Sequence, residues 1–205
     1  MVDETLLIQE SQNGNLDSFN QLILLYQGKA FNLAYRILWD EEAAEDAAQT
    51  AFISAFRGLK SFRGGSFRSW LLRMVTNSCY DELRRRKRHP NISLEPRQKE
   101  DDMELDSPSW MMDKVTLSPE KNLEALDMEH ALQHCIQNLP EDFRIVVLLV
   151  DLEELDYMEV SRVVGKPLGT IKSRVARARL RLRDCLNKFG ELLPDQYRLG
   201  IENNK

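Results

Sequence analysis

The residues with the clearest chemical potential are two blocks of cations that could bind phosphate. Residues 84–88 read RRRKR. A second block recurs along one stretch at Lys172, Arg174, Arg177, Arg179, Arg181 and Arg183. The chain as a whole has a net charge of −5. Because salt screens charges beyond about 10 Å, the local charge matters more to a phosphate than this net value. The blocks therefore predict nucleic acid as a partner.

An acidic stretch separates the two cationic blocks. It contains Glu100, Asp101, Asp102, Glu104, Asp106 and Asp113. No base compensates these charges, so the pattern is two cationic sites joined by an anionic connector. We expect the connector to compete with phosphate for the basic helices.

Metal binding and catalysis find little support. His130 and His134 lie four residues apart with Cys135 adjacent, a spacing that can hold zinc, but the sequence has no HExxH and no fourth ligand within reach. We therefore expect an exposed helix face and no metal. No nucleophile–base pattern, phosphate-binding loop or dinucleotide fingerprint occurs, which predicts that the chain has no cofactor and is not an enzyme.

Residues 156–186 carry the sharpest structural pattern. Asp156 and Glu159 can form a capping box, Gly165 suits a left-handed turn, and Pro167 can open the next helix. That next helix has one apolar stripe, consisting of Ile171, Val175, Ala178, Leu182 and Leu186. A short helix, a glycine turn and a cationic second helix predict a helix-turn-helix that enters a DNA major groove. The alternative is a solvated basic helix in an ordinary bundle.

The remaining periodicity is helical throughout. Helices are predicted over 15–38, with Asn15 or Asp17 as its cap, over 40–59 from Asp40, and over 67–88. Residues 61–66 (SFRGGS) form a loop, and the apolar run 145–150 is predicted to be a buried helix. The fold class is all-α, with two small helical domains joined by a flexible linker. Their predicted bounds are 1–90, a linker over 91–122, a second domain over 123–190, and a tail over 191–205.

Bulk properties indicate a cytoplasmic chain. The 205 residues contain no run apolar enough to span a membrane, and the N-terminus lacks a signal pattern, so we expect no membrane insertion. The three cysteines, Cys79, Cys135 and Cys185, are widely separated. In a cytoplasmic protein we expect them to be reduced and mostly packed in the interior.

Two blocks of sequence resemble one known family. Residues 139–182, including GTIKSRVARAR at 169–179, resemble region 4 of extracytoplasmic-function sigma factors. Residues 40–88, DEEAAEDAAQTAFISAFRGLKSFRGGSFRSWLLRMVTNSCYDELRRRKR, resemble region 2 of the same family. The resemblance implies a promoter-reading subunit that binds core RNA polymerase and promoter DNA, directs initiation, and is held in check by an anti-sigma factor. One departure is Glu154, where the family has a glycine.

The resemblance also implies residue roles. The −35 element would be read by Thr170, Lys172, Ser173, Arg174, Ala176 and Arg177. The −10 element would be read as single-stranded DNA by Phe62, Arg63, Gly64, Gly65, Ser66, Trp70 and Asn77, with Phe67 as a further stacking surface unless it packs in the core. The clamp helices of the largest polymerase subunit would contact Asp46, Gln49 and Phe52, and the β flap would be a further contact of the polymerase. From helical rotation alone, Arg174 and Arg179 should face acidic neighbours or DNA backbone.

Two other functions fit parts of the sequence. A DNA-binding activator or repressor could carry the same helix-turn-helix, but it would need a receiver or ligand domain in front, and the first ninety residues show no alternating strands. The other function is that of an adaptor that only sequesters a protein partner and does not bind DNA. This function gives no reason for either cationic block.

Overall fold

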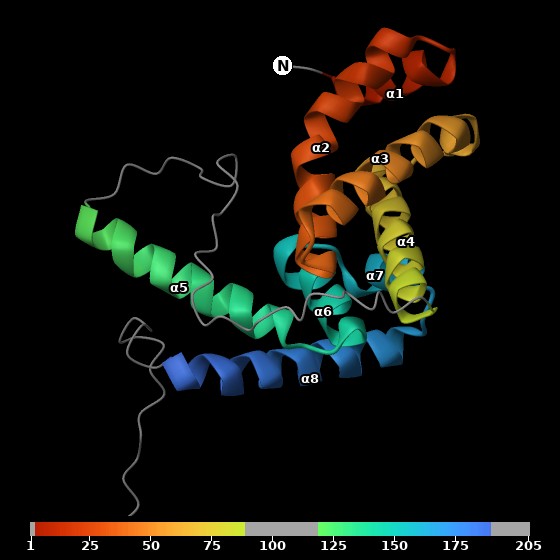
Figure 1. The fold of residues 1–205 in the computed structure, drawn as a ribbon. Coiled ribbons are helices and arrows are strands. Elements are labelled where there is room, and N and C mark those ends of the chain that lie inside the picture. The colour runs from red at the N-terminus through yellow and green to blue at the C-terminus, as the bar shows by residue number, and fades with distance from the viewer. Residues whose placement is uncertain (1–2, 89–118, 190–205) are drawn as a thin grey trace, which may run out of the picture.

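The computed structural model describes residues 3–88 and 119–189, with side chains from residue 128 onward in the second part. Regular structure in these ranges is entirely helical, which confirms the predicted fold class (Figure 1). The helices are α1 (Glu4–Gln12), α2 (Leu16–Leu38), α3 (Glu41–Gly58), α4 (Phe67–Arg88), α5 (Pro119–Gln137), α6 (Glu141–Val147), α7 (Tyr157–Val164) and α8 (Leu168–Leu186). Short helical turns follow α3, α6 and α8, and the one over Leu148–Leu152 is a π-turn. No described helix is long and apolar enough to cross a membrane.

The helix starts follow from local sequence. The Asn15 side chain accepts hydrogen bonds from the backbone N–H groups of Asp17 and Ser18, which caps α2. Asp40 caps α3 by accepting from Ala43 N–H at 3.0 Å. Each carboxylate or amide oxygen satisfies a donor that the first helical turn leaves unpaired. Both caps were predicted.

Two boundaries differ from the prediction. Helix α1 was not predicted, and it is capped by Asp3. Helix α5 begins at Pro119, inside the predicted linker, because proline is well suited to the first turn of a helix. The preceding linker residues, with all of the predicted acidic stretch, and the tail 191–205 lie outside the described residues.

One core joins the two halves of the chain. Leu72, Val75 and Cys79 of α4 are fully buried and belong to the same apolar cluster as Val160 of α7 and Ile145 of α6. Figure 1 shows α6 and α7 packed at the lower ends of α2 and α4. The predicted domains therefore pack against each other in this structure. This closed arrangement could not be predicted from either block of sequence alone.

Charged and polar contacts reinforce this interface between the halves. Arg68 of α4 pairs with the buried Glu153 at 2.8 Å, and Ser69 Oγ donates to Glu159 of α7 at 2.5 Å. Arg144 of α6 donates to the carbonyl of Ile37 at 2.7 Å. That carbonyl lies at the negative end of α2, where a cation is favoured. Burial lowers the pKa of Arg144.

The cysteine prediction is half wrong. Cys135 of α5 and Cys185 of α8 form a disulfide with their Cα atoms 5.7 Å apart. The two residues are 50 positions apart, and only the packing of α5 along α8 brings them together. Cys79 is free and buried, as expected, and burial raises its pKa to about 12.

Candidate nucleic-acid interface and partner groove

Helices α7 and α8 form the predicted helix-turn-helix. Asp156 and Glu159 make the capping box, since each side chain accepts from the other residue's backbone N–H, at 2.7 and 3.1 Å. Gly165 then turns the chain with φ +66°. Val160, Val163, Ile171 and Val175 are buried and hold the two helices together. The capping box, the left-handed glycine and the inward stripe were all predicted from spacing.

The outward face of α8 begins with small and cationic side chains. Lys172, Ser173, Ala176 and Arg177 are exposed, and Thr170 is half-buried. Within the described residues Lys172 and Arg177 form no ion pair, so their charges face solvent. These two cations are placed to meet an external phosphate or base edge.

Two other arginines of α8 are turned away from this face. Arg174 donates to Asp142 at 2.6 Å, and Arg179 forms a bidentate pair with Asp151. The rotation predicted from sequence is confirmed for both, because each pairs with an acidic neighbour. The half-buried Arg174 lies beside Asn77 and Tyr80 of α4 in a hollow between the halves.

The loop before α4 encloses a second hollow. It is lined by Phe62, Arg63, Gly64, Gly65, Ser66 and Trp70, together with Arg73. These are all of the predicted −10 residues except Asn77, which lies about two helical turns further along α4. Gly64 and Gly65 have φ of +92° and +91°, a conformation that other residues adopt at a cost.

The aromatic side chains near this hollow divide into core and surface. Phe67 is only 2% exposed, so it is a core residue and offers no stacking face. Phe62 and Trp70 are half-buried, with ring centroids 5.1 Å apart. They are the aromatic faces that a base could reach after a small rearrangement.

Helix α7 closes the same hollow from the other half. Glu159, Arg162 and Val163 form part of its wall. Glu159 also accepts the hydrogen bond from Ser69. The second half of the chain therefore covers one side of this hollow in the structure.

An apolar groove runs between α2 and α3. Its volume is about 1070 Å³, and Leu16, Leu24, Ile53 and Phe56 line it with large exposed side chains. Gln49 and Phe52 also line it, but Asp46 does not. Asp46 lies instead in a small polar hollow near Glu82 and Arg85. An exposed apolar patch of this kind on a monomer marks a partner site.

Sequence reasoning missed most of this groove. The sequence does contain a signal for the groove, because Leu24 and Ile53 are apolar residues that lie outside the buried stripes of their helices. An apolar residue on the outer side of an amphipathic helix has no core to join. The groove itself, however, exists only where the outer sides of α2 and α3 meet.

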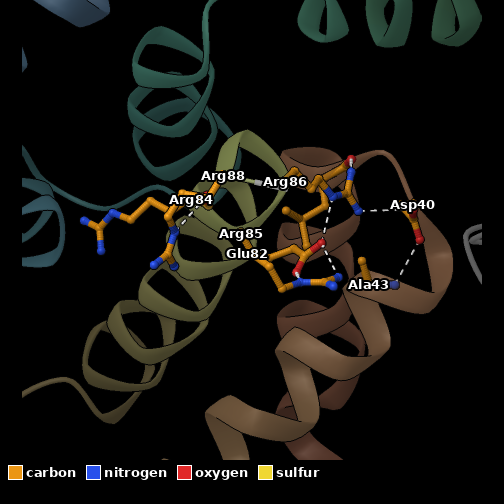
Figure 2. Close-up of polar contacts among 8 residues, drawn as sticks. Asp40, Ala43, Glu82, Arg84, Arg85, Arg86 and Arg88 are labelled. Carbon is orange, nitrogen blue, oxygen red and sulfur yellow. Dashed lines mark hydrogen bonds and ion pairs between the residues drawn. The ribbon is translucent and has the colours of Figure 1, made fainter. Parts of the chain in front are cut away.

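The basic block at the end of α4 is partly neutralised (Figure 2). Glu82 accepts from both Arg85 and Arg86, and the hydrogen bond from Arg85 is the main cause of its lowered pKa. Arg86 also reaches Asp40 at 3.1 Å. Lys87 pairs with Glu141 at 2.6 Å, and Arg88 is the one cation of this block that forms no ion pair with the described residues; it donates to the carbonyl of Arg84.

The fold and these surfaces define a class: a two-part helical protein with a helix-turn-helix for DNA and an apolar groove for a protein partner. Comparison with known families identifies which family of this class the chain resembles. Residues 22–89 match the family model Sigma-70 region 2, and residues 129–182 match Sigma-70, region 4. The RNA polymerase sigma-H factor of Pseudomonas aeruginosa is 36% identical over 174 residues, covering 84% of this chain and 88% of that protein. The ECF RNA polymerase sigma factor SigW of Bacillus subtilis is 32% identical, covering 87% and 94%.

The chain therefore belongs to the extracytoplasmic-function group of the sigma-70 family of RNA polymerase sigma factors. Solved structures agree on the fold. CnrH, in complex with the cytosolic domain of CnrY, has a TM-score of 0.61 at 20% identity and covers 89% of this chain and 96% of its own. The sigma factor RpoE from Bartonella quintana, in complex with the anti-sigma factor NepR, has a TM-score of 0.61 at 24% identity, covering 82% and 96%.

Proposed function

We propose that this sigma factor works in the cytoplasm, where it binds core RNA polymerase through the α2–α3 groove and reads two promoter elements with α4 and α8. The observation that carries the proposal is the pairing of an exposed apolar groove on one half with an outward cationic helix-turn-helix face on the other. The first surface suits a protein helix and the second suits DNA. The chain supplies specificity and no catalytic group.

Helix α8 reads the −35 element in this proposal. Thr170 near its start, with Lys172 and Arg177 on its outward face, meets phosphates and base edges, and Ser173 and Ala176 lie between them. Ala176 presents a methyl group, which can touch a thymine methyl. Arg174 contributes only after its pair with Asp142 is exchanged for DNA.

The loop and the start of α4 take the −10 element as a single strand. The backbone at Gly64 and Gly65 can approach an extruded base closely because neither residue has a side chain. Arg63 supplies charge, Ser66 a hydroxyl, and Phe62 with Trp70 the aromatic faces. Asn77 completes the surface from the next turns of α4.

The groove receives a helical partner with its own apolar face. The clamp helices of the largest polymerase subunit are the proposed occupant, with Gln49 and Phe52 as contacts and Asp46 at the edge. The β flap of the polymerase would contact the second half. Control by an anti-sigma factor is also proposed, because two proteins of this fold are known in complexes with such regulators or their cytosolic domains.

The test is promoter-specific initiation by core polymerase reconstituted with the full chain. We expect transcripts from cognate promoters only when the chain is added. Replacing exposed Ile53 with Asp should abolish core binding, whereas the matched change of exposed Leu6, an apolar residue of α1 outside the groove, should leave core binding intact. Specific DNA binding without any polymerase dependence would instead favour a conventional activator or repressor.

A further inference from the structure

We propose that Cys135 and Cys185 form a reversible thiol–disulfide switch that controls how firmly α5 is held against the recognition helix. The two residues are bonded in the structure, and they join α5 to the last turn of α8. The residues that face the −35 element lie at the other end of the same helix. The bond thus connects the linker side of the second half directly to its DNA-reading element.

Little else holds the described side chains of α5 on α8. Of the α5 side chains described, only Ala131, Gln133 and Cys135 are buried, and Ile136 packs on the core shared with the first half. Leu132 and His134 are exposed. No large aliphatic side chain of residues 128–137 is buried along this contact, so the disulfide is the strongest link to α8 in that part of α5.

The end of α8 is less firmly packed than its start. Ile171, Val175 and Ala178 are fully buried, but beyond Ala178 no described side chain of α8 is. Leu182 packs only partly, against the small cluster around Leu139 and Val147. The last turn of α8 is therefore anchored mostly through Cys185.

The compartment in which the chain works also favours a reversible bond, which rests on the proposed function. A promoter-reading subunit works in the cytoplasm, where glutathione and thioredoxin-type reductants keep most thiols reduced. A disulfide in such a protein is typically transient and redox-sensing. The pair is also separated from the remaining thiol, since Cys79 is buried in the core and its raised pKa keeps it protonated at neutral pH.

The proposed oxidant class is a peroxide. The half-buried Cys185 thiolate attacks one oxygen of hydrogen peroxide, so that an S–O bond forms, the O–O bond breaks, and the departing hydroxide takes up a proton to become water. Cys135, which is 1% exposed, then attacks that sulfur. The S–S bond forms, the S–O bond breaks, and a second water leaves. Two thiols lose two electrons and two protons, and one peroxide becomes two waters. A dithiol reductant reverses the reaction and becomes a disulfide itself.

The bond should have a large effect on local order. It closes a loop of 50 residues, and the chain-entropy model gives a shift of about 1,000-fold toward the folded second half for a loop of that size. Reduction should therefore raise hydrogen exchange in the second half, with the largest increase in α5 and the last turns of α8, and should leave α2 and α3 unchanged.

The decisive experiment counts thiols in cells. The full chain is expressed, quenched in acid, denatured and treated with a maleimide–polyethylene glycol, before and after a hydrogen peroxide pulse. We expect three modified cysteines before the pulse, one after it, and three again after recovery. Cys79→Ser is the matched control and should change from two to none and back. Cys185→Ser should stay at two throughout, whereas Cys135→Ser should fall from two to one, because the S–O bond formed at Cys185 then has no second thiol to break it.

Two outcomes would overturn the switch. Three modified cysteines in the wild-type chain after peroxide would show that the pair does not oxidise. One modified cysteine at all times, including in unstressed cells, would show a permanent structural bond. Neither readout involves transcription. The thiol count therefore tests the switch even if the proposed sigma activity fails.

Discussion

Replacing Arg68 should open the interface between the two halves. Arg68 lies on α4 and pairs at 2.8 Å with Glu153, whose side chain is only 7% exposed, while its own is 27% exposed. Methionine keeps the length and the apolar stem of the arginine but removes the charge. The substitution therefore leaves a nearly buried carboxylate without its partner in the closed arrangement, while the open arrangement returns that carboxylate to water.

The expected magnitude follows from the burial of the pair. Removing one partner of a fully buried pair costs about 3–5 kcal/mol. This pair should be worth less, because Arg68 is partly exposed and its Nε atom is buried without a hydrogen-bond partner in the described structure. We take about 2 kcal/mol, which corresponds to a shift of about 30-fold toward the open form, since about 1.4 kcal/mol is a factor of ten.

The assay is single-molecule energy transfer in the full chain. Dyes are attached to non-natural amino acids at the exposed Lys60 of the first half and Lys188 of the second, which avoids the cysteines. We expect the ratio of low-transfer to high-transfer molecules to rise about 30-fold in Arg68→Met. Arg57→Met, the same change at an exposed site on α3, should leave it at the wild-type value.

A double-mutant cycle separates the pair from general damage. Glu153→Gln alone should open the halves less, since the amide can still hydrogen-bond without carrying a charge. Combined with Arg68→Met, it should recover part of the loss, because no unpaired charge remains. If Arg68→Met leaves the distribution unchanged, or if the two effects simply add, the pair does not hold the halves together and the reasoning is wrong.

Further predictions concern the second half and the free thiol. Arg177→Ala should cost about 1–3 kcal/mol of discrimination at one −35 position, whereas Arg179→Ala should weaken all promoters alike, as measured by transcription from a −35 substitution library at two salt concentrations. Cys185→Ser removes the disulfide. Compared with the oxidised wild-type chain, it should lower the free energy of unfolding of the second half by about 4 kcal/mol, as measured by urea denaturation. Glu154→Gly should raise stability by about 0.5–1 kcal/mol in thermal melts, because Glu154 has φ +51°. Native Cys79, with a pKa of about 12, should resist iodoacetamide at pH 8 until the protein is unfolded.

The features that sequence predicted best depend on residues within one turn of each other. The caps at Asn15, Asp40 and Asp156 each involve a donor two or three positions away, so local spacing is sufficient. The left-handed Gly165 and the stripe through Ile171 follow in the same way. For these residues the tertiary structure only selects among conformations that the local chain already favours.

The features that sequence missed depend on which helices meet. The groove needs Leu24 and Ile53 on neighbouring helices, and the disulfide needs α5 along α8. Glu153 could be placed neither in the interior nor beside Arg68 without knowing that the halves pack together. The position of Asp46 relative to the groove could not be predicted for a related reason: it lies one helical turn from Gln49, but on the side of α3 that faces Glu82 and Arg85.

The closed arrangement gives an order to promoter recognition. The hollow at the loop before α4 is walled by Glu159 and Arg162 of α7, and Arg174 of α8 is turned toward α4, whereas Lys172 and Arg177 on the outward face of α8 stay exposed while the halves are together. The α2–α3 groove has no residue of the second half in its wall and is open in the same state. In the proposed function a polymerase helix can therefore bind first, and the loop before α4 becomes fully accessible to single-stranded DNA once the halves separate. Separation of the halves costs free energy, so only a fraction of the free chain is open. The apparent affinity of the free chain for DNA is reduced in proportion to that fraction. The sequence alone predicts that the acidic connector causes this weakness by competing with phosphate. The packed interface acts in the same direction, through contacts such as Arg68–Glu153 and Ser69–Glu159 that involve no residue of the connector.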